Sequence, residues 1–325
     1  MKPLIRIGSR GSQLALWQAN HILYALRDAG YNVDLQVIRT TGDRMQQPGF
    51  VLPSGLDGKG IFIKEIEEAL QSGDIDLAVH SLKDLPTQLA PQFTLAAIPK
   101  RADARDVFVC ENFWALHTLP YNATIGTTSP RRRAQLLHLR PDLRFVEIRG
   151  NIDTRLKKFA AGHCDALVLA AAGLDRLKRA EWVHQRFDIE EMCPAPGQGA
   201  LALETRSSGH ALDESHDAYV RSAIAFLEHP WTRLCVDTER HVLHALGGGC
   251  QLPVGAHCAP PATPGAPFRL HAQVVAPDGE SIAQVTLESH TPQPEAWGRE
   301  AATLLIDQGA LTLLQPHAEE ATPGA

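Results

Sequence analysis

Segments typical of β-strands alternate with segments typical of amphipathic α-helices through the first two hundred residues. Residues 4–9 and 33–37 alternate in the manner of half-buried strands. Between them, Ser12 can cap a helix that ends before Gly30. A strand, a helix and a second strand in this order form a parallel sheet whose two faces are covered by helices. The chain therefore predicts an α/β fold.

The alternation restarts after Lys100 and gives way to a different pattern from about Arg233. Strands are expected at 124–126, 145–148 and 166–170, and the helices between them begin after Ser129 and Asn151. Beyond Arg233, a helix precedes two strand-like runs that flank Pro277-Asp278-Gly279, which is a hairpin signal. We therefore expect two α/β units followed by a smaller α+β unit.

Charge and hydropathy exclude several classes of function. The net charge is −6 over 325 residues, which disfavours binding to nucleic acid or to an anionic membrane. The longest apolar run, 166–174, is about half as long as a membrane span requires. Arg6 and Arg10 interrupt the segment in which a signal peptide needs an apolar stretch. We expect a cytoplasmic protein.

The six cysteines are scattered and form no CxxC pair. A disulfide framework is not expected in a chain of this size without a secretory signal. Cys250, His257 and Cys258 lie close together but match no common spacing of zinc ligands. We therefore expect no metal site.

Polar and basic residues follow four of the expected strands, where the ligands of open α/β sheets bind. In two of these segments, a hydroxyl or an amide begins a helix beside arginines, so backbone N–H groups, the helix dipole and guanidinium groups form an anion site. Arginine binds carboxylates in a bidentate way, so the expected ligand carries several carboxylates or phosphates. The four segments are SRGS at 9–12, VHSLKDLP at 79–86, GTTSPRRR at 126–133 and RGNIDTR at 149–155.

Each of these features also has a simpler interpretation. Arg131, Arg132 and Arg133 could form a solvated helix face or a nucleic-acid patch, although the negative net charge and the lack of interleaved aromatic residues argue against the latter. Arg10 alone could be a surface residue. Asp84 is the only acidic residue in 77–90, and it could cap a turn, or stabilise a cation and shuttle a proton.

Cys250 follows three consecutive glycines in the segment GGGCQLPVG at 247–255. Glycines without a Cβ let the backbone turn sharply and let a bulky group approach, and Pro253 prevents a helix downstream. The thiol could carry or attack a group. It could equally be a buried structural cysteine after a glycine helix cap. These residues alone leave both interpretations open.

Taken together, these segments resemble the successive motifs of the porphobilinogen deaminase (hydroxymethylbilane synthase) family. The motifs occur in the family's order from residue 9 to residue 255. LAAAGLDRL alone is a weak signal, whereas AVHSLKDLP and GGGCQLP in this order are very specific. The matching segments are SRGSQLALWQA, DGKGIFIKEIE, AVHSLKDLP, GTTSPRRRAQL, RGNIDTRL, LAAAGLDRL, PAPGQGALALE and GGGCQLPVG.

The resemblance implies an activity in porphyrin and haem biosynthesis. The family joins four porphobilinogen molecules head to tail into hydroxymethylbilane and releases ammonia at each step. Its cofactor is a dipyrromethane made from the substrate and held by a thioether, which here falls on Cys250. Loss of ammonia leaves a methylene-pyrrole cation, which a fixed carboxylate stabilises better than bulk water. The implied catalytic residue is Asp84.

The resemblance also implies a set of binding residues, which agrees with the acetate and propionate that each pyrrole carries. Lys59 and Phe62 match the family's active-site lid, at the end of a glycine-rich loop over 40–60, although Phe62 could instead pack in the core. The residues matched to the cofactor are Cys250, Lys83, Asp84, Thr127, Ser129, Arg131, Arg132 and Arg155. Those matched to the substrate are Arg10, Ser12, Arg149, Arg155, Arg176 and Gln198.

The fold implied by the resemblance has two periplasmic-binding-protein-like (type II) α/β domains with crossing hinges, near which Gln198 would lie. A small α+β domain would present Cys250. The strand at 200–204 would return to the first domain and make it discontinuous. We expect a monomer with three domains, comprising 1–100 with 200–222, 101–199, and 223–325.

The chain departs from the family's pattern in three places. Asp57-Gly58 replaces the usual glycine pair before Lys59, the loop after Gly42-Asp43 is a few residues longer, and 207–232 is extended and matches poorly. The main alternative is a non-enzymatic binding protein, because two α/β units around an anion site also describe solute receptors. That alternative predicts a signal peptide or a DNA-binding helix pair, and it gives Cys250 no role.

Overall fold

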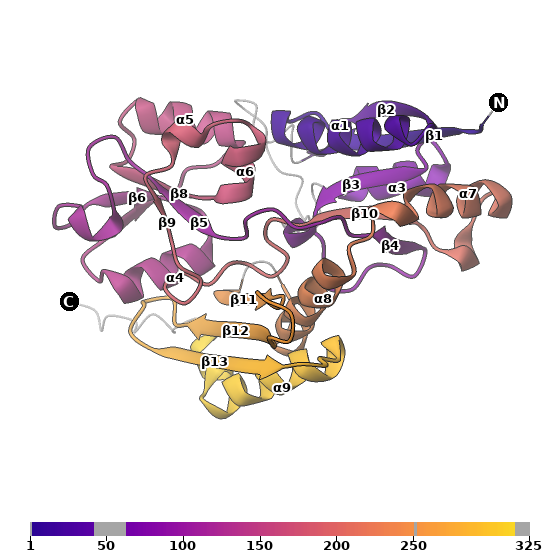
Figure 1. The fold of residues 1–325 in the computed structure, drawn as a ribbon. Helices are drawn as coiled ribbons and strands as arrows, with labels where there is room; N and C mark the ends of the chain where they lie inside the picture. Colours follow the sequence, from indigo (N-terminus) through magenta and orange to yellow (C-terminus); the bar gives the residue numbers. More distant parts are fainter. Residues whose placement is uncertain (1, 42–62, 250–251, 316–325) are drawn as a thin grey trace, which may run out of the picture.

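The chain folds into three sheet-based units, which Figure 1 shows side by side around a common centre. A computed structural model describes residues 2–41, 63–249 and 252–315. We call the units first, second and third after the order in which their sheets begin along the chain. The expected lid residues Lys59 and Phe62 and the expected anchor Cys250 lie outside the described residues.

The first unit is a five-stranded sheet in the order β2-β1-β3-β10-β4. Helices α1 and α7 cover one face, where Ile22 and Val220 join the apolar core, and α3 covers the other, where Ile66 packs. Its strands are β1 (Leu4–Arg10), β2 (Asn32–Ile38), β3 (Leu77–Ser81), β4 (Phe93–Ala97) and β10 (Leu201–Arg206). Its helices are α1 (Gln13–Asp28), α3 (Lys64–Ser72) and α7 (Glu214–Ile224).

The second unit repeats this topology with the order β7-β6-β8-β5-β9. Leu136 of α4 packs on one face, and Phe159 of α5 and Leu174 of α6 pack on the other. Its strands are β5 (Asp106–Val109), β6 (Thr124–Gly126), β7 (Arg144–Val146), β8 (Ala166–Ala170) and β9 (Gln185–Arg186). Its helices are α4 (Pro130–Leu139), α5 (Ile152–Ala160) and α6 (Ala171–Arg176).

The expectation of wholly parallel sheets is wrong, because each sheet contains one reversed strand. β10 runs antiparallel to β3 and β4, and β5 runs antiparallel to β8 and β9. Each reversed strand enters its sheet directly from the other unit. It therefore lacks the helical crossover that makes successive strands parallel. The return of β10 to the first sheet is the crossing that the resemblance implied.

The two connecting segments lie against each other between the units. The N–H of Ala102 donates to the carbonyl of Gly199 at 3.2 Å. Gly199 has φ of 86°, and a Cβ there would lie 2.8 Å from the carbonyl oxygen of Ala102. Only glycine tolerates both the left-handed backbone and this close approach.

The third unit is a three-stranded antiparallel sheet in the order β11-β12-β13, covered by α8 and α9. The hairpin expected around Pro277-Asp278-Gly279 joins β12 to β13. The strands are β11 (Val254–Ala259), β12 (Phe268–Val275) and β13 (Ile282–Ser289), and the helices are α8 (Pro230–Ala245), α9 (Pro294–Asp307) and α10 (Ala310–Leu313). Short 3-10 turns are η1 (Leu82–Asp84), η2 (Leu116–Thr118), η3 (Ala180–Trp182), η4 (Ser208–His210) and η5 (Ala225–Leu227).

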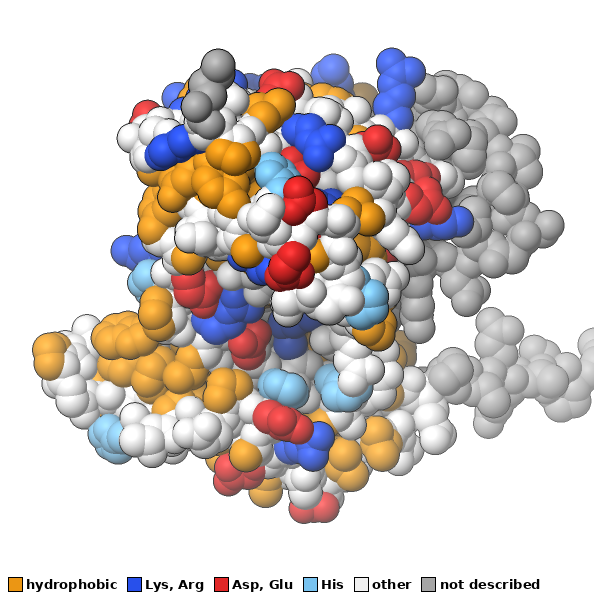
Figure 2. Space-filling model, turned by 90° about the vertical axis from the view of Figure 1, so that its right-hand side faces the viewer, with side chains coloured by type: hydrophobic (Ala, Val, Ile, Leu, Met, Phe, Trp, Pro, Cys, Tyr) orange, Lys and Arg blue, Asp and Glu red, His pale blue; other side chains and the backbone are white. Residues whose placement is uncertain are grey.

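Glu239 of α8 joins the third unit to both segments that connect the other two. It is fully buried and pairs with Arg101 of the first connecting segment. Its carboxylate also accepts hydrogen bonds from the N–H of Gly197, at 2.7 Å, and from the N–H of Cys258 in β11, at 2.8 Å. Charged side chains also gather where the upper and lower parts of the molecule meet (Figure 2). The third unit is thus tied to the hinge between the other two.

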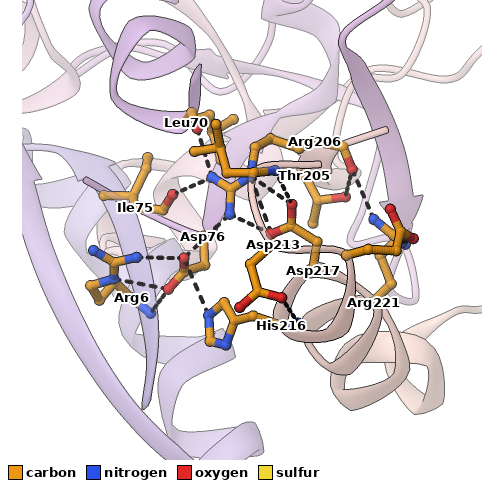
Figure 3. A network of polar contacts seen from close by, with 12 residues as sticks. Arg6, Leu70, Ile75, Asp76, Thr205, Arg206, Asp213, His216, Asp217 and Arg221 are labelled. Carbon is orange, nitrogen blue, oxygen red and sulfur yellow. Dashed lines mark hydrogen bonds and ion pairs between the residues drawn. The ribbon is translucent and has the colours of Figure 1, made fainter. Parts of the chain in front are cut away.

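A buried ion network holds the return strand β10 in the first unit (Figure 3). Arg206 pairs with Asp217 of α7 and lies 3.4 Å from Asp76, which Arg6 of β1 binds on its other side. The Arg206 guanidinium also donates to the carbonyls of Leu70 and Ile75 at 2.6 and 2.8 Å. Because these partners come from distant segments, the network connects β10 to the rest of its sheet.

Within the described residues, no helix is long and apolar enough to cross a membrane.

Candidate active site

A cavity of about 260 Å³ lies between the first and second units, beyond the carboxyl ends of β1, β3 and β8. It is the place where ligands of open α/β sheets bind. Five basic side chains and one aspartate from segments far apart in the sequence line it together. The predicted site residues that it gathers are Arg10, Ser12, Lys83, Asp84, Arg132, Arg155 and Arg176.

Asp84 stands at the end of the 3-10 turn η1, directly after the buried strand β3. Leu82 and Leu85 anchor this turn in the core, and the N–H of Leu82 donates to the carbonyl of Ala200 at 3.0 Å. The Asp84 side chain remains exposed and lines the cavity. A short turn fixed on both sides of the aspartate thus presents its carboxylate to the cavity.

Lys83 lines the cavity and is half-buried. Its Nζ donates to Oε1 of Gln198 at 3.2 Å. Burial, reinforced by the positive charge of Arg132, lowers the pKa of Lys83 to about 8, although Asp84 opposes the shift. The ammonium charge is therefore present at neutral pH and is lost not far above it.

Arg155 and Arg176 approach the cavity from α5 and α6 of the second unit. Each is held by a backbone carbonyl, with Nε of Arg155 donating to Gly150 and Nη2 of Arg176 donating to Gly199, both at 2.7 Å. Burial lowers the pKa of each to about 10, so both remain charged at neutral pH. The remaining N–H groups of these guanidinium groups can bind ligand carboxylates.

Ser12 caps α1 as expected from the sequence. Its Oγ accepts a hydrogen bond from the N–H of Ala15 at 3.3 Å. The helix thus begins at the cavity, with its positive dipole end beside the Ser12 hydroxyl and Arg10.

Asp106 is a site residue that the sequence did not indicate. It begins β5, is fully buried, and pairs with Arg131 at 2.7 Å and Arg132 at 2.8 Å. Burial raises the pKa of Asp106, but Arg131 and Arg132 outweigh it and lower the pKa well below the usual range. The sequence around Asp106 contains no motif, because its partners Arg131 and Arg132 lie on α4, after the intervening strand β6.

The arginines of α4 differ in their surroundings. Arg131 is 3% exposed, and its Nη1 donates to the carbonyl of Cys193 at 2.6 Å, so it supports Asp106 and does not line the cavity. Arg132 binds Asp106 and also lines the cavity. The interpretation of all three as a solvated face is therefore wrong for this pair. It holds for Arg133, which is exposed over the Phe145 ring.

Three predicted binding residues lie apart from this cavity. Thr127 and Ser129 line a second hollow of about 440 Å³, between the second and third units, together with Pro253. Arg149 is exposed and pairs with Glu147 at 2.9 Å. In this structure none of these three side chains lines the wall that carries Asp84.

Gln198 is fully buried at the hinge and does not line the cavity. Its Nε2 donates to the carbonyl of Ala104 at 2.7 Å and to Asp106 at 2.9 Å, while its Oε1 accepts from Lys83. In place of the predicted contact with substrate, the geometry gives Gln198 a supporting role behind Lys83 and Asp106.

A buried histidine–glutamate pair also escaped the sequence reasoning. His80 of β3 lines the cavity, and its Nε2 lies 3.0 Å from Oε2 of Glu204 in β10. The two residues are nearly opposite on antiparallel strands, since Ala202 is the partner of His80. The strand pairing brings them together across more than a hundred residues.

The segment that leads to Cys250 has the backbone that its glycines predict. Gly247 and Gly248 have φ of 101° and 56°, which side chains rarely adopt. A Cβ at Gly247 would meet nothing within 4 Å, so the backbone at this glycine is not covered on that side. With five basic side chains in the cavity, the described residues fit a group that bears several carboxylates.

Comparisons with known proteins decide the family. The model described as "Porphobilinogen deaminase, dipyromethane cofactor binding domain" matches residues 5–214, and the model of the porphobilinogen deaminase C-terminal domain matches 233–307. The chain belongs to the porphobilinogen deaminase family. Porphobilinogen deaminase of Sulfurimonas denitrificans is 42% identical over 318 residues, or 97% of each chain. That of Rubrobacter xylanophilus is 44% identical over 308 residues, or 95% of each.

Solved structures show a more remote likeness. The methionine-binding protein MetQ covers 69% of this chain and 95% of its own, with a TM-score of 0.42 and 13% identity. A putative methionine-binding lipoprotein of Bacillus subtilis gives a TM-score of 0.41 with 12% identity. The fold of a porphobilinogen deaminase, with two type II α/β units and a third small unit, rests instead on the sheet topology above and on the family match.

Proposed function

We propose that this porphobilinogen deaminase joins porphobilinogen units into hydroxymethylbilane in the cavity between the first and second units, and that Asp84 is its catalytic carboxylate. One observation carries the assignment of the site. A single exposed aspartate stands among five basic side chains where strands from both units end. The product grows by one acetate and one propionate at each step, so its binding requires several fixed cations.

The basic residues divide by position around Asp84. The charges of Lys83 and Arg155 interact with that of Asp84, and Arg132 interacts with both of these cations. These three basic residues would hold the carboxylates of the dipyrromethane. Arg10, Ser12 and Arg176 line the rest of the cavity and would hold the incoming porphobilinogen. When bound to Cys250, the dipyrromethane supplies the pyrrole carbon to which porphobilinogen is added.

The chemistry requires one negative charge at a fixed place. Departure of ammonia breaks the C–N bond of the substrate's aminomethyl group and leaves a methylene-pyrrole cation. The Asp84 carboxylate can stabilise that cation through its pyrrole N–H without reorganising water. After the new carbon–carbon bond has formed, the attacking pyrrole carbon loses its proton, and an Asp84 oxygen can accept it. The ammonia released earlier can take up this proton and leave as ammonium.

The division into three domains, the monomeric state and the cytoplasmic location also belong to this proposal. The three sheets support domains over 1–100 with 200–222, 101–199, and 223–325. The net charge of −6 supports a protein that binds neither nucleic acid nor membrane. The described cysteines, which exclude Cys250, are all free thiols, as expected in a reducing compartment.

Replacing Asp84 by Asn tests the assignment. Asp84→Asn keeps the shape of the side chain and removes its charge, so we expect kcat to fall by about a thousandfold or more with an unchanged melting temperature. Asp28→Asn, at the exposed end of α1, is the matched control and should leave kcat unchanged. Turnover of porphobilinogen by Asp84→Asn within tenfold of the natural protein would remove Asp84 from the catalytic role.

A further inference from the structure

The segment that follows Asp84 has no regular secondary structure of its own to hold it. Residues 85–92 lie between η1 and β4 and include two prolines, which donate no backbone hydrogen bond. Yet the position of the Asp84 carboxylate depends on this segment, because η1 is a single turn. Some other part of the molecule must therefore fix it.

The far end of the segment is held within the first unit, where the N–H and Oγ of Ser207 donate to the carbonyls of Gln92 and Pro91. The end next to Asp84 is held by α8 of the third unit. Nη2 of Arg240 donates to the carbonyls of Pro86 and Thr87, at 2.7 and 3.0 Å. One turn earlier on the same helix face, Val236 is fully buried in a cluster with Leu82 and Leu85. The turn that carries Asp84 is thus held from α8 by one polar and one apolar contact.

The burial of Arg240 indicates more than a surface contact. Arg240 is 9% exposed, and burial lowers its pKa although Asp237 opposes the shift. An arginine is seldom buried at such a cost unless its donors are used. Here the donors satisfy two backbone carbonyls for which the irregular segment offers no ladder partner.

The same helix leads to the glycine segment before Cys250. His244, one turn after Arg240, lies 3.3 Å from Gln88 between their Nε2 atoms. Beyond it, a Cβ on Gly248 would lie 3.3 Å from Oγ1 of Thr87. The segment after Asp84 and the glycine segment 247–249, which we call the cofactor arm, therefore lie close together. Arg240 donates to the carbonyl of Thr87 at the same place.

We propose that Arg240 is a positioning residue that sets the Asp84 turn relative to the arm on which the cofactor is carried. It fastens 86–87 of the first unit to α8 of the third. The reacting end of the bound pyrrole chain must lie within bonding reach of the carboxylate, and small displacements of a catalytic group cost large factors in rate. This inference rests on the proposed role of Asp84.

Two variants of Arg240 and one control test the proposal in the cofactor-loaded full-length enzyme. Arg240→Met removes both hydrogen bonds, and Arg240→Lys keeps the charge with a single donor head in place of the planar guanidinium. Arg233→Met is the matched control. Arg233 lies two turns earlier on α8 and donates to the carbonyl of Leu95 while pairing with Glu228, so its partners lie outside residues 82–88.

We expect Arg240→Met to lower kcat per cofactor-loaded molecule by between about tenfold and a hundredfold, with KM changed less than twofold. Arg240→Lys should recover part of kcat, and Arg233→Met should lose melting temperature but keep kcat. Intact mass gives the cofactor content of each variant. If Arg240→Met does not fold, kcat of Arg240→Lys alone decides whether the proposal stands.

The proposal is overturned if kcat per loaded molecule stays within twofold in both Arg240 variants, or if Arg233→Met loses as much. It is also overturned if the loss of activity equals the loss of cofactor. Inactivity of the natural protein toward porphobilinogen would instead contradict the proposed function, so the two failures are distinct.

Discussion

Asp84 and Lys83 are adjacent in the chain, yet the structure places them in different surroundings. The Asp84 side chain is exposed to the cavity, whereas Lys83 points back to Gln198 in the hinge. The aspartate can therefore face a reacting ring. The charge of the lysine depends on its buried environment, because burial and the nearby Arg132 lower the pKa of Lys83. That environment gives the activity of this enzyme a pH dependence of its own.

We expect kcat/KM for porphobilinogen to fall about tenfold between pH 7 and 9 as Lys83 loses its charge. The pKa of Lys83 is lowered to about 8, mainly by burial, so the charge is present at pH 7 and lost by pH 9. A hydrogen bond to a charged group contributes about 1.5–3 kcal/mol, which corresponds to tenfold or more. The measurement is kcat/KM against pH.

Lys83→Arg is the comparison that isolates this effect. Arginine stays charged throughout the range, so the fall in kcat/KM that belongs to Lys83 should disappear in the variant. Titration of the substrate's own amine affects both proteins alike. An identical decline in the two proteins would show that Lys83 is not the titrating group.

The residues that the sequence identified are those that motifs place at strand ends. Their short segments indicate their chemistry without a structure, as they do for Lys83, Asp84, Arg155 and the Ser12 cap. Asp106 was missed, because it acts only by meeting arginines from another element. Local spacing cannot show which charges share a buried site.

Among the elements, the return strand β10 has the least local support. It enters the first sheet after the whole second unit has been formed, and Arg206 at its end supplies the ionic contacts shown in Figure 3. Strand–helix alternation predicts most of the elements correctly but not this reversal. The direction of β10 depends on a crossing between units, which leaves no periodic signal.

We expect Arg206→Met to destabilise the protein by about 3–5 kcal/mol, because it leaves the buried Asp217 uncompensated. The change also removes hydrogen bonds to the carbonyls of Leu70 and Ile75. Thermal or urea unfolding measures the loss.

Arg221→Met provides the control for this network. Arg221 lies on the same helix as Asp217, pairs with the exposed Glu214 and donates to the backbone carbonyl of Arg206 at 3.3 Å, without touching Asp217 or Asp76. Its loss leaves no buried charge unpaired and should cost less than about 2 kcal/mol. Equal destabilisation by the two changes would show that the buried network contributes no more to the free energy of unfolding than the contacts of Arg221 do.

At the scale of the whole molecule, the second unit and the first enclose the cavity, while the third unit supplies α8 and the arm that leads to Cys250. Glu239 fastens α8 to the hinge, and Arg240 fastens it to the segment after Asp84. The sequence pattern predicted three successive units, and the resemblance implied that the chain returns to the first. How α8 is fastened to the other two units could not be derived from the pattern, since neither contact lies within one unit.

The central proposal is that Cys250 carries the dipyrromethane. The five described thiols are all buried, with Cys164 the most accessible at 8% exposed, so none of them is placed to carry such a group. Intact mass of the purified protein tests the claim most directly. We predict an increment equal to two porphobilinogen-derived pyrroles, and its absence in Cys250→Ser. An active protein with an unmodified mass, or an increment that persists in Cys250→Ser, would contradict it.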